Sequence, residues 1–184
     1  GKPASATKLE IRSKTGGIVQ LGLAGGRWMI QQPVGARADS RLVERMIEAL
    51  FSVKAERFIW DPVVDPVVEK DPAVPEAAPG PRVEVYGLAR DEAAARVTVW
   101  VSGSEAGREL ILGKPASEDG KQVYVKLGDS DSVYAVSREI LDLFSVGMND
   151  LRDRMLFALE PDRIRHAVFR EGDRTFMATG CKLD

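Results

Sequence analysis

The chain has 184 residues, with 26 lysines and arginines against 28 aspartates and glutamates, so its formal net charge is −2 at pH 7. Because both signs are interspersed, we expect no basic face or stripe of the kind that binds nucleic acid. The single cysteine, Cys181, excludes an intramolecular disulfide and a cysteine cage for a metal, and no apolar stretch approaches the roughly 18 residues of a membrane span.

The first part of the chain alternates apolar and polar residues in three short runs. Glycine pairs at 16–17 and 25–26 separate these runs. A period of two between such turns is typical of an antiparallel meander with one buried face. The apolar positions that would form this face are Leu9, Ile11, Val19, Leu21, Leu23, Trp28 and Ile30.

After Pro33 the apolar spacing becomes that of an amphipathic helix that ends near Val53. Asp39 stands where an N-cap side chain accepts hydrogen bonds from the first turn. A short strand is predicted at residues 58–60. We therefore predict a first unit over residues 8–60, in which the helix covers one face of the meander. The apolar stripe of the helix consists of Leu42, Val43, Met46, Ile47, Leu50 and Phe51.

Residues 61–82 break this pattern. Six of the ten prolines lie between Pro62 and Pro81, together with several acidic residues. Proline fixes φ and disfavours helix in the residue before it. We therefore predict an extended, semi-rigid acidic linker.

A second meander-plus-helix unit is predicted over residues 83–160, with longer turns than the first. A second helical segment is predicted near its end, at residues 149–159. The strands of this unit are expected around Val97, Val99 and Val101, around Leu110 and Leu112, and around Val123 and Val125.

Residues 132–146 fit two interpretations. In the first, Val133 and Ala135 continue a strand, and Ser137 caps the helix that follows. In the second, the helix begins near Ser132, the position that aligns with the cap of the first helix. The sequence leaves both open.

A third cycle begins at the end of the chain. Residues 161–184 are predicted to start a third unit as a hairpin that turns at Gly172. Since a lone two-stranded hairpin is marginal in water, we expect it to pack against the second unit or to add its edge to a neighbouring sheet or subunit. The expected fold class is α+β, with two tandem antiparallel β-meander-plus-helix units and this partial third unit. Phe51 and Phe144 should then occupy equivalent buried positions.

The side chains that could act as nucleophile, acid or base form no recognisable catalytic set. The only histidine, His166, shares strand parity with Ile164 and Val168, so we expect it to point toward the core or its edge. A catalytic triad would need a partner that the chain does not obviously supply. Cys181 has no histidine near it in sequence, and an inert thiol is expected. No catalytic residue, metal ligand or cofactor is therefore assigned, and the ligand-binding residues are unknown.

Three other motifs have simpler explanations. Gly-Lys-Pro-Ala-Ser occurs at residues 1–5 and 113–117, but the proline and the spacing exclude a P-loop, and turn chemistry accounts for the second copy. Residues 129–132 resemble the opening of a calcium loop but lack its later glycine and glutamate. Asp61 and Asp65 lie in the predicted linker, which would not hold two carboxylates at a catalytic separation.

The three tryptophans, Trp28, Trp60 and Trp100, all fall on predicted strands. Large aromatic residues at strand spacing usually pack in a core or on a sheet. If instead they were exposed together in one cleft, they would line a groove for a ligand.

Several short motifs occur in a characteristic order and spacing. They are Trp28-Met29-Ile30 to Pro33, Ala38-Asp39, Tyr86-Gly87-Leu88, Leu112-Gly113, Tyr124-Val125 and Leu151-Arg152-Asp153-Arg154. Together they resemble the domain-of-unknown-function 4340 family over residues 9–169. This resemblance implies an extracytoplasmic protein held by an N-terminal membrane helix and found beside ABC-type transporters of the gliding-motility type. Because the chain begins at Gly1, we expect such an anchor to precede it. The family has no established activity, so no site residue is carried over.

We therefore expect a non-enzymatic accessory or interaction module with a protein partner in a membrane transporter complex. A first alternative is a domain that binds a glycan or small molecule in a groove between the two units. A second is a hydrolytic enzyme, which would require a convergent pocket of perturbed carboxylates or a partner for His166.

Overall fold

The computed structural model describes residues 6–61, 83–155 and 165–179. It divides into two compact units, Gly1–Asp153 and Arg154–Asp184. Most of the predicted linker, together with Asp65 and Cys181, lies outside the described residues.

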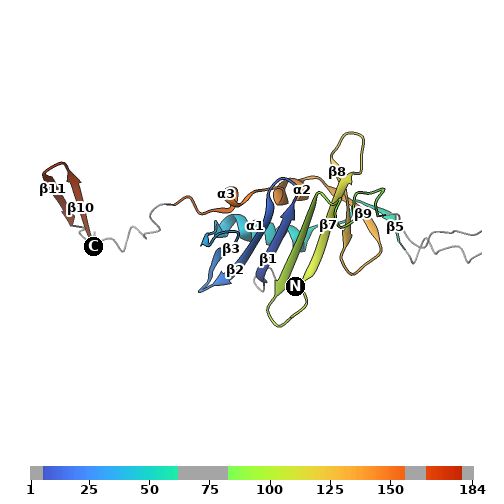
Figure 1. The fold of residues 1–184 in the computed structure, drawn as a ribbon, viewed down its shortest axis with the longest axis horizontal. Coiled ribbons are helices and arrows are strands. Elements are labelled where there is room, and N and C mark those ends of the chain that lie inside the picture. The colour runs from blue at the N-terminus through green and yellow to red at the C-terminus, as the bar shows by residue number, and fades with distance from the viewer. Residues whose placement is uncertain (1–5, 62–82, 156–164, 180–184) are drawn as a thin grey trace, which may run out of the picture. The chain divides into compact units, whose positions relative to one another are not determined.

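The larger compact unit, Gly1–Asp153, is built on a nine-stranded antiparallel sheet (Figure 1). Its strand order is β4-β3-β2-β1-β6-β7-β8-β9-β5. The strands are β1 (Ala6–Ser13), β2 (Gly17–Ala24), β3 (Arg27–Gln32), β4 (Ala36–Arg37), β5 (Arg57–Trp60), β6 (Ala95–Val101), β7 (Arg108–Pro115), β8 (Gln122–Leu127) and β9 (Val133–Ser137). The fold is thus mostly antiparallel sheet with a few helices, as the α+β prediction requires.

The first strands of the two meanders meet at the centre of this sheet. β1 pairs antiparallel with β6, and Leu9 lies opposite Val99 while Ile11 lies opposite Val97. From this pair the strands run outward in chain order on both sides, β2 to β4 on one and β7 to β9 on the other. The alternating residues predicted to be buried on β1 are buried.

Helix α1 (Ser40–Ser52) begins as the sequence predicts. The Asp39 carboxylate accepts hydrogen bonds from the backbone N–H of Arg41 at 3.0 Å and of Leu42 at 3.2 Å. These bonds satisfy donors that a helix N-terminus would otherwise leave unpaired. Val43, Met46 and Ile47 form the buried part of its apolar stripe.

For residues 132–146 the strand of the first interpretation is confirmed, but the residue at the N-cap of the helix is Arg138 and not Ser137. Residues Val133–Ser137 form β9, and the short helix α2 (Glu139–Phe144) comes after it. The Ser137 hydroxyl accepts a hydrogen bond from the N–H of Glu139 at 3.4 Å. A prediction that fails is the second helical segment, because α3 covers only Met148–Leu151 and the chain is extended at Arg152.

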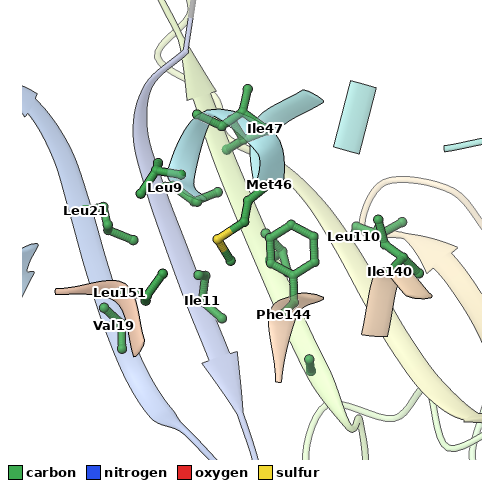
Figure 2. Close-up of a cluster of buried hydrophobic side chains, with 14 of the residues drawn as sticks. Leu9, Ile11, Val19, Leu21, Met46, Ile47, Leu110, Ile140, Phe144 and Leu151 are labelled. Atoms are coloured by element: carbon green, nitrogen blue, oxygen red, sulfur yellow. The ribbon is translucent and has the colours of Figure 1, made fainter. Parts of the chain in front are cut away.

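Side chains from the three helices and the sheet form one core (Figure 2). Met46 of α1 and Phe144 at the end of α2 are both fully buried members of this core. Phe144 is fully buried, whereas Phe51 is only half-buried and packs at the margin of this core. The two phenylalanines therefore do not have equivalent burial, which corrects the expectation from the sequence.

Residues 83–94 cover part of the opposite face of the sheet. Leu88 and Ala93 from this segment form a second buried cluster with Ile111 and Val133. The segment lies so close to β7 that a Cβ at Gly113 would be 2.3 Å from the carbonyl oxygen of Tyr86. Both faces of the sheet are thus packed in its C-terminal half.

Strand β5 follows α1 in the chain but does not join the first meander. It pairs antiparallel with β9, where Arg57 lies opposite Ala135. The last strand of the predicted first unit thus forms an edge of the sheet beside the second meander.

The second compact unit contains a two-stranded antiparallel sheet, β10 (His166–Glu171) and β11 (Arg174–Thr179). Gly172 in the connecting loop has a φ of 56°, a conformation that glycine adopts readily. The predicted hairpin and its turn are confirmed.

Candidate functional site

The edge of the large sheet at β5 combines an open strand with a polar groove. Among the described residues β5 has one neighbouring strand, β9, so its other edge is unpaired. We call the surface formed by Glu56, Arg57, Phe58, residues 116–122 and Ser137 the β5-edge site.

Hydrogen bonds hold the start of β5 against two other elements. The N–H of Glu56 donates to the carbonyl oxygen of Ala135 at 2.9 Å. The Arg57 guanidinium donates to the carbonyl oxygen of Ala116 at 2.7 Å, and the Gln122 side-chain amide donates to the Glu56 carboxylate. The strand is therefore fixed to β9 and also to the turn between β7 and β8.

That turn is ordered by Ser117 and Asp119. The Ser117 hydroxyl donates to the Asp119 carboxylate at 2.6 Å and accepts from the N–H of Gln122 at 3.1 Å. The hydrogen bond from Ser117, followed by those from Lys121, holds the pKa of Asp119 below its usual value. The second Gly-Lys-Pro-Ala-Ser copy thus ends in a hydrogen-bonded turn, as the sequence predicts.

These elements line an open groove with a volume of about 900 Å³. Its wall carries both signs of charge, with Glu118 and Asp119 facing the same space as Lys121 and Arg57. A second hollow of about 380 Å³ lies next to it, between the end of α1 and the start of α2, and shares Glu56 and Ser137 with the first.

Phe58, the next residue on β5, is an apolar side chain outside the groove, and strand alternation turns it to the opposite face from Arg57. Its side chain is 73% exposed, although it contacts the Tyr134 ring edge-on at a centroid distance of 5.5 Å. It lies on a strand with one open edge among the described residues, so it is available as an aromatic anchor for a partner.

The three tryptophans do not meet in one cleft. Trp28 is 4% exposed and lies in the core below the helices. Trp60 packs against the second cluster on the other face. Trp100 lies on β6, with the Lys8 ammonium 4.6 Å from its ring centroid. The tryptophan-lined groove that would support a glycan-binding domain is therefore not formed.

His166 is exposed on the hairpin, which corrects the prediction that it points toward the core or its edge. The parity argument assumed that one face of the hairpin is buried, but nearly every side chain of β10 and β11 is exposed.

The other acidic motifs have structural partners or lie in turns. Asp131 lies 3.5 Å from the Lys126 ammonium, and the Ser130 hydroxyl accepts from the N–H of Ser132. Within residues 6–61, 83–155 and 165–179, no three His, Cys, Asp or Glu side chains are placed to hold a metal ion.

The sequence predicts a turn near residue 117 but assigns neither this turn nor Glu56 and Arg57 to a functional site. The Ser-x-Asp-Gly run at residues 117–120 is a recognisable turn signal. Its position beside β5 depends on the long-range pairing with β9, which no local pattern contains.

Comparison with known proteins gives one match. A family model described as "Domain of unknown function (DUF4340)" matches residues 28–180, which is more than half of the chain. No curated protein and no solved structure matches. In the part of the chain that the structure describes, no helix has the length and apolar character to cross a membrane. The match over most of the sequence means that the chain belongs to the DUF4340 family.

Proposed function

We propose that the protein is a non-enzymatic interaction module, extracytoplasmic and anchored to the membrane in its full-length form, that serves a membrane transporter complex. In this proposal a protein partner binds at the β5-edge site. The observation that carries the proposal is that β5 has no second neighbouring strand among the described residues, while its own Phe58 is 73% exposed.

An extended segment of a partner can add a strand to an open sheet edge. The backbone groups of β5 would supply hydrogen bonds, while pockets for alternate side chains would give specificity. Phe58 is placed to contact an apolar side chain of the partner, and the mixed charges of the groove are placed to contact its polar groups. Because β5 has only four residues, it offers few backbone groups for unspecific pairing.

We also infer that the large sheet arose from two tandem β-meander-plus-helix units. The strand order supports this inference, since β1 to β4 and β6 to β9 run outward in the same sequence from the central β1–β6 pair. Each meander is followed by a helix, α1 or α2. The β5-edge site would then lie where one unit adds a strand to the other.

Site-specific photo-crosslinking in the native host tests the partner-binding proposal. A photoreactive amino acid at position 58 of the full-length protein should give an adduct with a component of a membrane transporter, identified by mass spectrometry. The same amino acid at Glu44, exposed on α1, is the matched control and should not give this adduct.

A second experiment tests whether the Phe58 side chain itself contributes to binding of the partner. Phe58→Asp should reduce recovery of the cross-linked component when the photoreactive group is placed at Arg57 instead. If position 58 gives no protein adduct, or the same adducts as position 44, the proposal is wrong.

Binding of a small polar ligand is the second candidate. The groove of about 900 Å³ favours it, because Lys121, Arg57 and Gln122 can donate hydrogen bonds there. The positions of the tryptophans remove the aromatic platform expected for a glycan. We therefore rank this candidate below a protein partner.

A further inference from the structure

The β10–β11 hairpin exposes apolar side chains on both of its faces. Val168 lies opposite Met177 on one face, and Phe169 lies opposite Phe176 on the other. Their exposed fractions are 55%, 80%, 61% and 51% in that order. A two-stranded sheet with these side chains in water is marginal, so a stable form should cover at least one edge.

We propose that β10 pairs antiparallel with β10 of a second copy of this chain, to give a four-stranded sheet across a two-fold axis. The axis stands perpendicular to the sheet, because only that orientation relates two adjacent antiparallel strands of identical sequence. Such an axis places one residue opposite its own copy. We place Val168 there.

Backbone geometry permits this register. A two-residue loop, Gly172-Asp173, joins β10 to β11, and the residues that flank such a loop exchange their backbone hydrogen bonds. Alternation then turns the N–H and C=O groups of the odd-numbered residues of β10 toward β11. Those of the even-numbered residues, His166, Val168 and Arg170, face the other edge. With any one residue of β10 on the axis, even-numbered residues oppose even-numbered residues of the second copy, so a hydrogen-bonded antiparallel ladder can form, and the choice of register depends on the side chains.

Charge complementarity selects the register with Val168 on the axis. Arg165 of each copy then lies opposite Glu171 of the other, so two pairs of opposite charge close the ends of the interface. With Phe169 on the axis, Glu171 would lie opposite Ala167 and Arg170 opposite Val168. Both Arg165–Glu171 pairs would be lost, and Arg165 would face Asp173, which lies in the loop and not on a strand.

The edge of β11 offers no such complement. Arg174 is the only charged residue among Arg174–Thr179. Pairing of β11 with its own copy would therefore leave each arginine without an opposite charge across the interface. The β10 edge is the one whose sequence is complementary to itself.

The apolar side chains also line up in the four-stranded sheet. On one face, Met177 and Val168 of one copy continue into Val168 and Met177 of the second copy. On the other face, Phe176 and Phe169 continue into Ala167 and Ala178 of the second copy, so large side chains meet small ones. The large sheet already contains a contact of this kind, since β1 and β6, the first strands of its meanders, pair antiparallel.

The first test measures the mass of the chain in solution. Sedimentation or light scattering at neutral pH should show a monomer–dimer equilibrium. Val168→Arg places two like charges on the axis and should shift the protein to the monomer. Val34→Arg is the matched control, because Val34 is similarly exposed, at 60%, but lies outside the hairpin. It should leave the equilibrium unchanged.

The second test reads the register by disulfide cross-linking and does not depend on Val168. With Cys181 replaced by serine, Ala167→Cys and Phe169→Cys proteins should cross-link when mixed under mild oxidation, because Ala167 lies opposite Phe169 of the second copy. Neither protein alone should cross-link at a comparable rate. A monomer at all concentrations, a dimer that Val168→Arg leaves intact, or rapid self-cross-linking of either cysteine variant would overturn the proposal.

Discussion

Glu10 shows how neighbouring side chains set the charge state of a carboxyl group on the sheet. Its carboxylate accepts hydrogen bonds from Arg12 at 2.6 Å and from Gln20 on the next strand at 2.7 Å. Burial acts to raise its pKa, but these hydrogen bonds and the charges of Arg12 and Lys8 together outweigh burial and hold the pKa below its ordinary value of 4.5. The folded state therefore favours the charged form.

The stability of the fold should depend on this group below neutral pH. Because the folded pKa lies below the unfolded one, Glu10 contributes stability above pH 4.5, and this contribution is lost as pH falls through the folded pKa. In Glu10→Gln, urea unfolding from pH 7 to pH 2 should show a smaller loss of stability than in the original protein. Glu44→Gln, on the exposed side of α1, is the control and should retain the full loss. An unchanged profile in Glu10→Gln would contradict this assignment.

Among the elements, the short α3 explains why helical periodicity alone misleads. The carbonyl oxygen of Leu151 accepts from the N–H of Asp39 at 2.8 Å, and the N–H of Asp153 donates to the carbonyl oxygen of Arg37 at 3.0 Å. Arg152 forms a β-bridge with Ala38. After Leu151 the chain therefore pairs with the segment that precedes α1, and this tertiary pairing overrides the local preference for helix.

The close packing of residues 83–94 on β7 gives a prediction for that strand. In Gly113→Ala the new Cβ would lie 2.3 Å from the Tyr86 carbonyl oxygen, a backbone atom that must move. We expect a loss of about 1–3 kcal/mol in the free energy of unfolding, as for other overpacked sites. Gly35→Ala is the control, since its Cβ would meet nothing within 4 Å, and it should change stability by less than about 0.5 kcal/mol. Equal effects in urea titrations would show that this segment does not pack as described.

For the whole molecule, the sequence predicts the elements better than their pairing. Alternation on β1 and the cap at Asp39 are local signals, and the structure confirms both. The pairing of β1 with β6 and of β5 with β9 joins segments that are distant in sequence, and no periodicity encodes them. The β5-edge site could not be predicted for the same reason, because it exists only once β5 lies beside the turn at 116–122.

The difference in burial between Phe51 and Phe144 can be tested through the stability of the whole fold. Phe144→Ala should reduce the free energy of unfolding by about 3–5 kcal/mol, since its ring is fully buried in the main core. Phe51→Ala should cost clearly less, because Phe51 is only half-buried at the margin of that core. Chemical denaturation of both variants compares them directly. Equal losses would mean that the two rings are buried alike after all.

The pairing of β5 with β9 also bears on the order in which the chain can fold. The meanders consist of hairpins that close over short turns, and such contacts form early. The β1–β6 and β5–β9 contacts must each close a much longer loop before they gain any energy. During synthesis, β5 leaves the ribosome well before its partner strand exists. The sheet therefore cannot be completed until the second meander, which lies between β1 and β5, has been made.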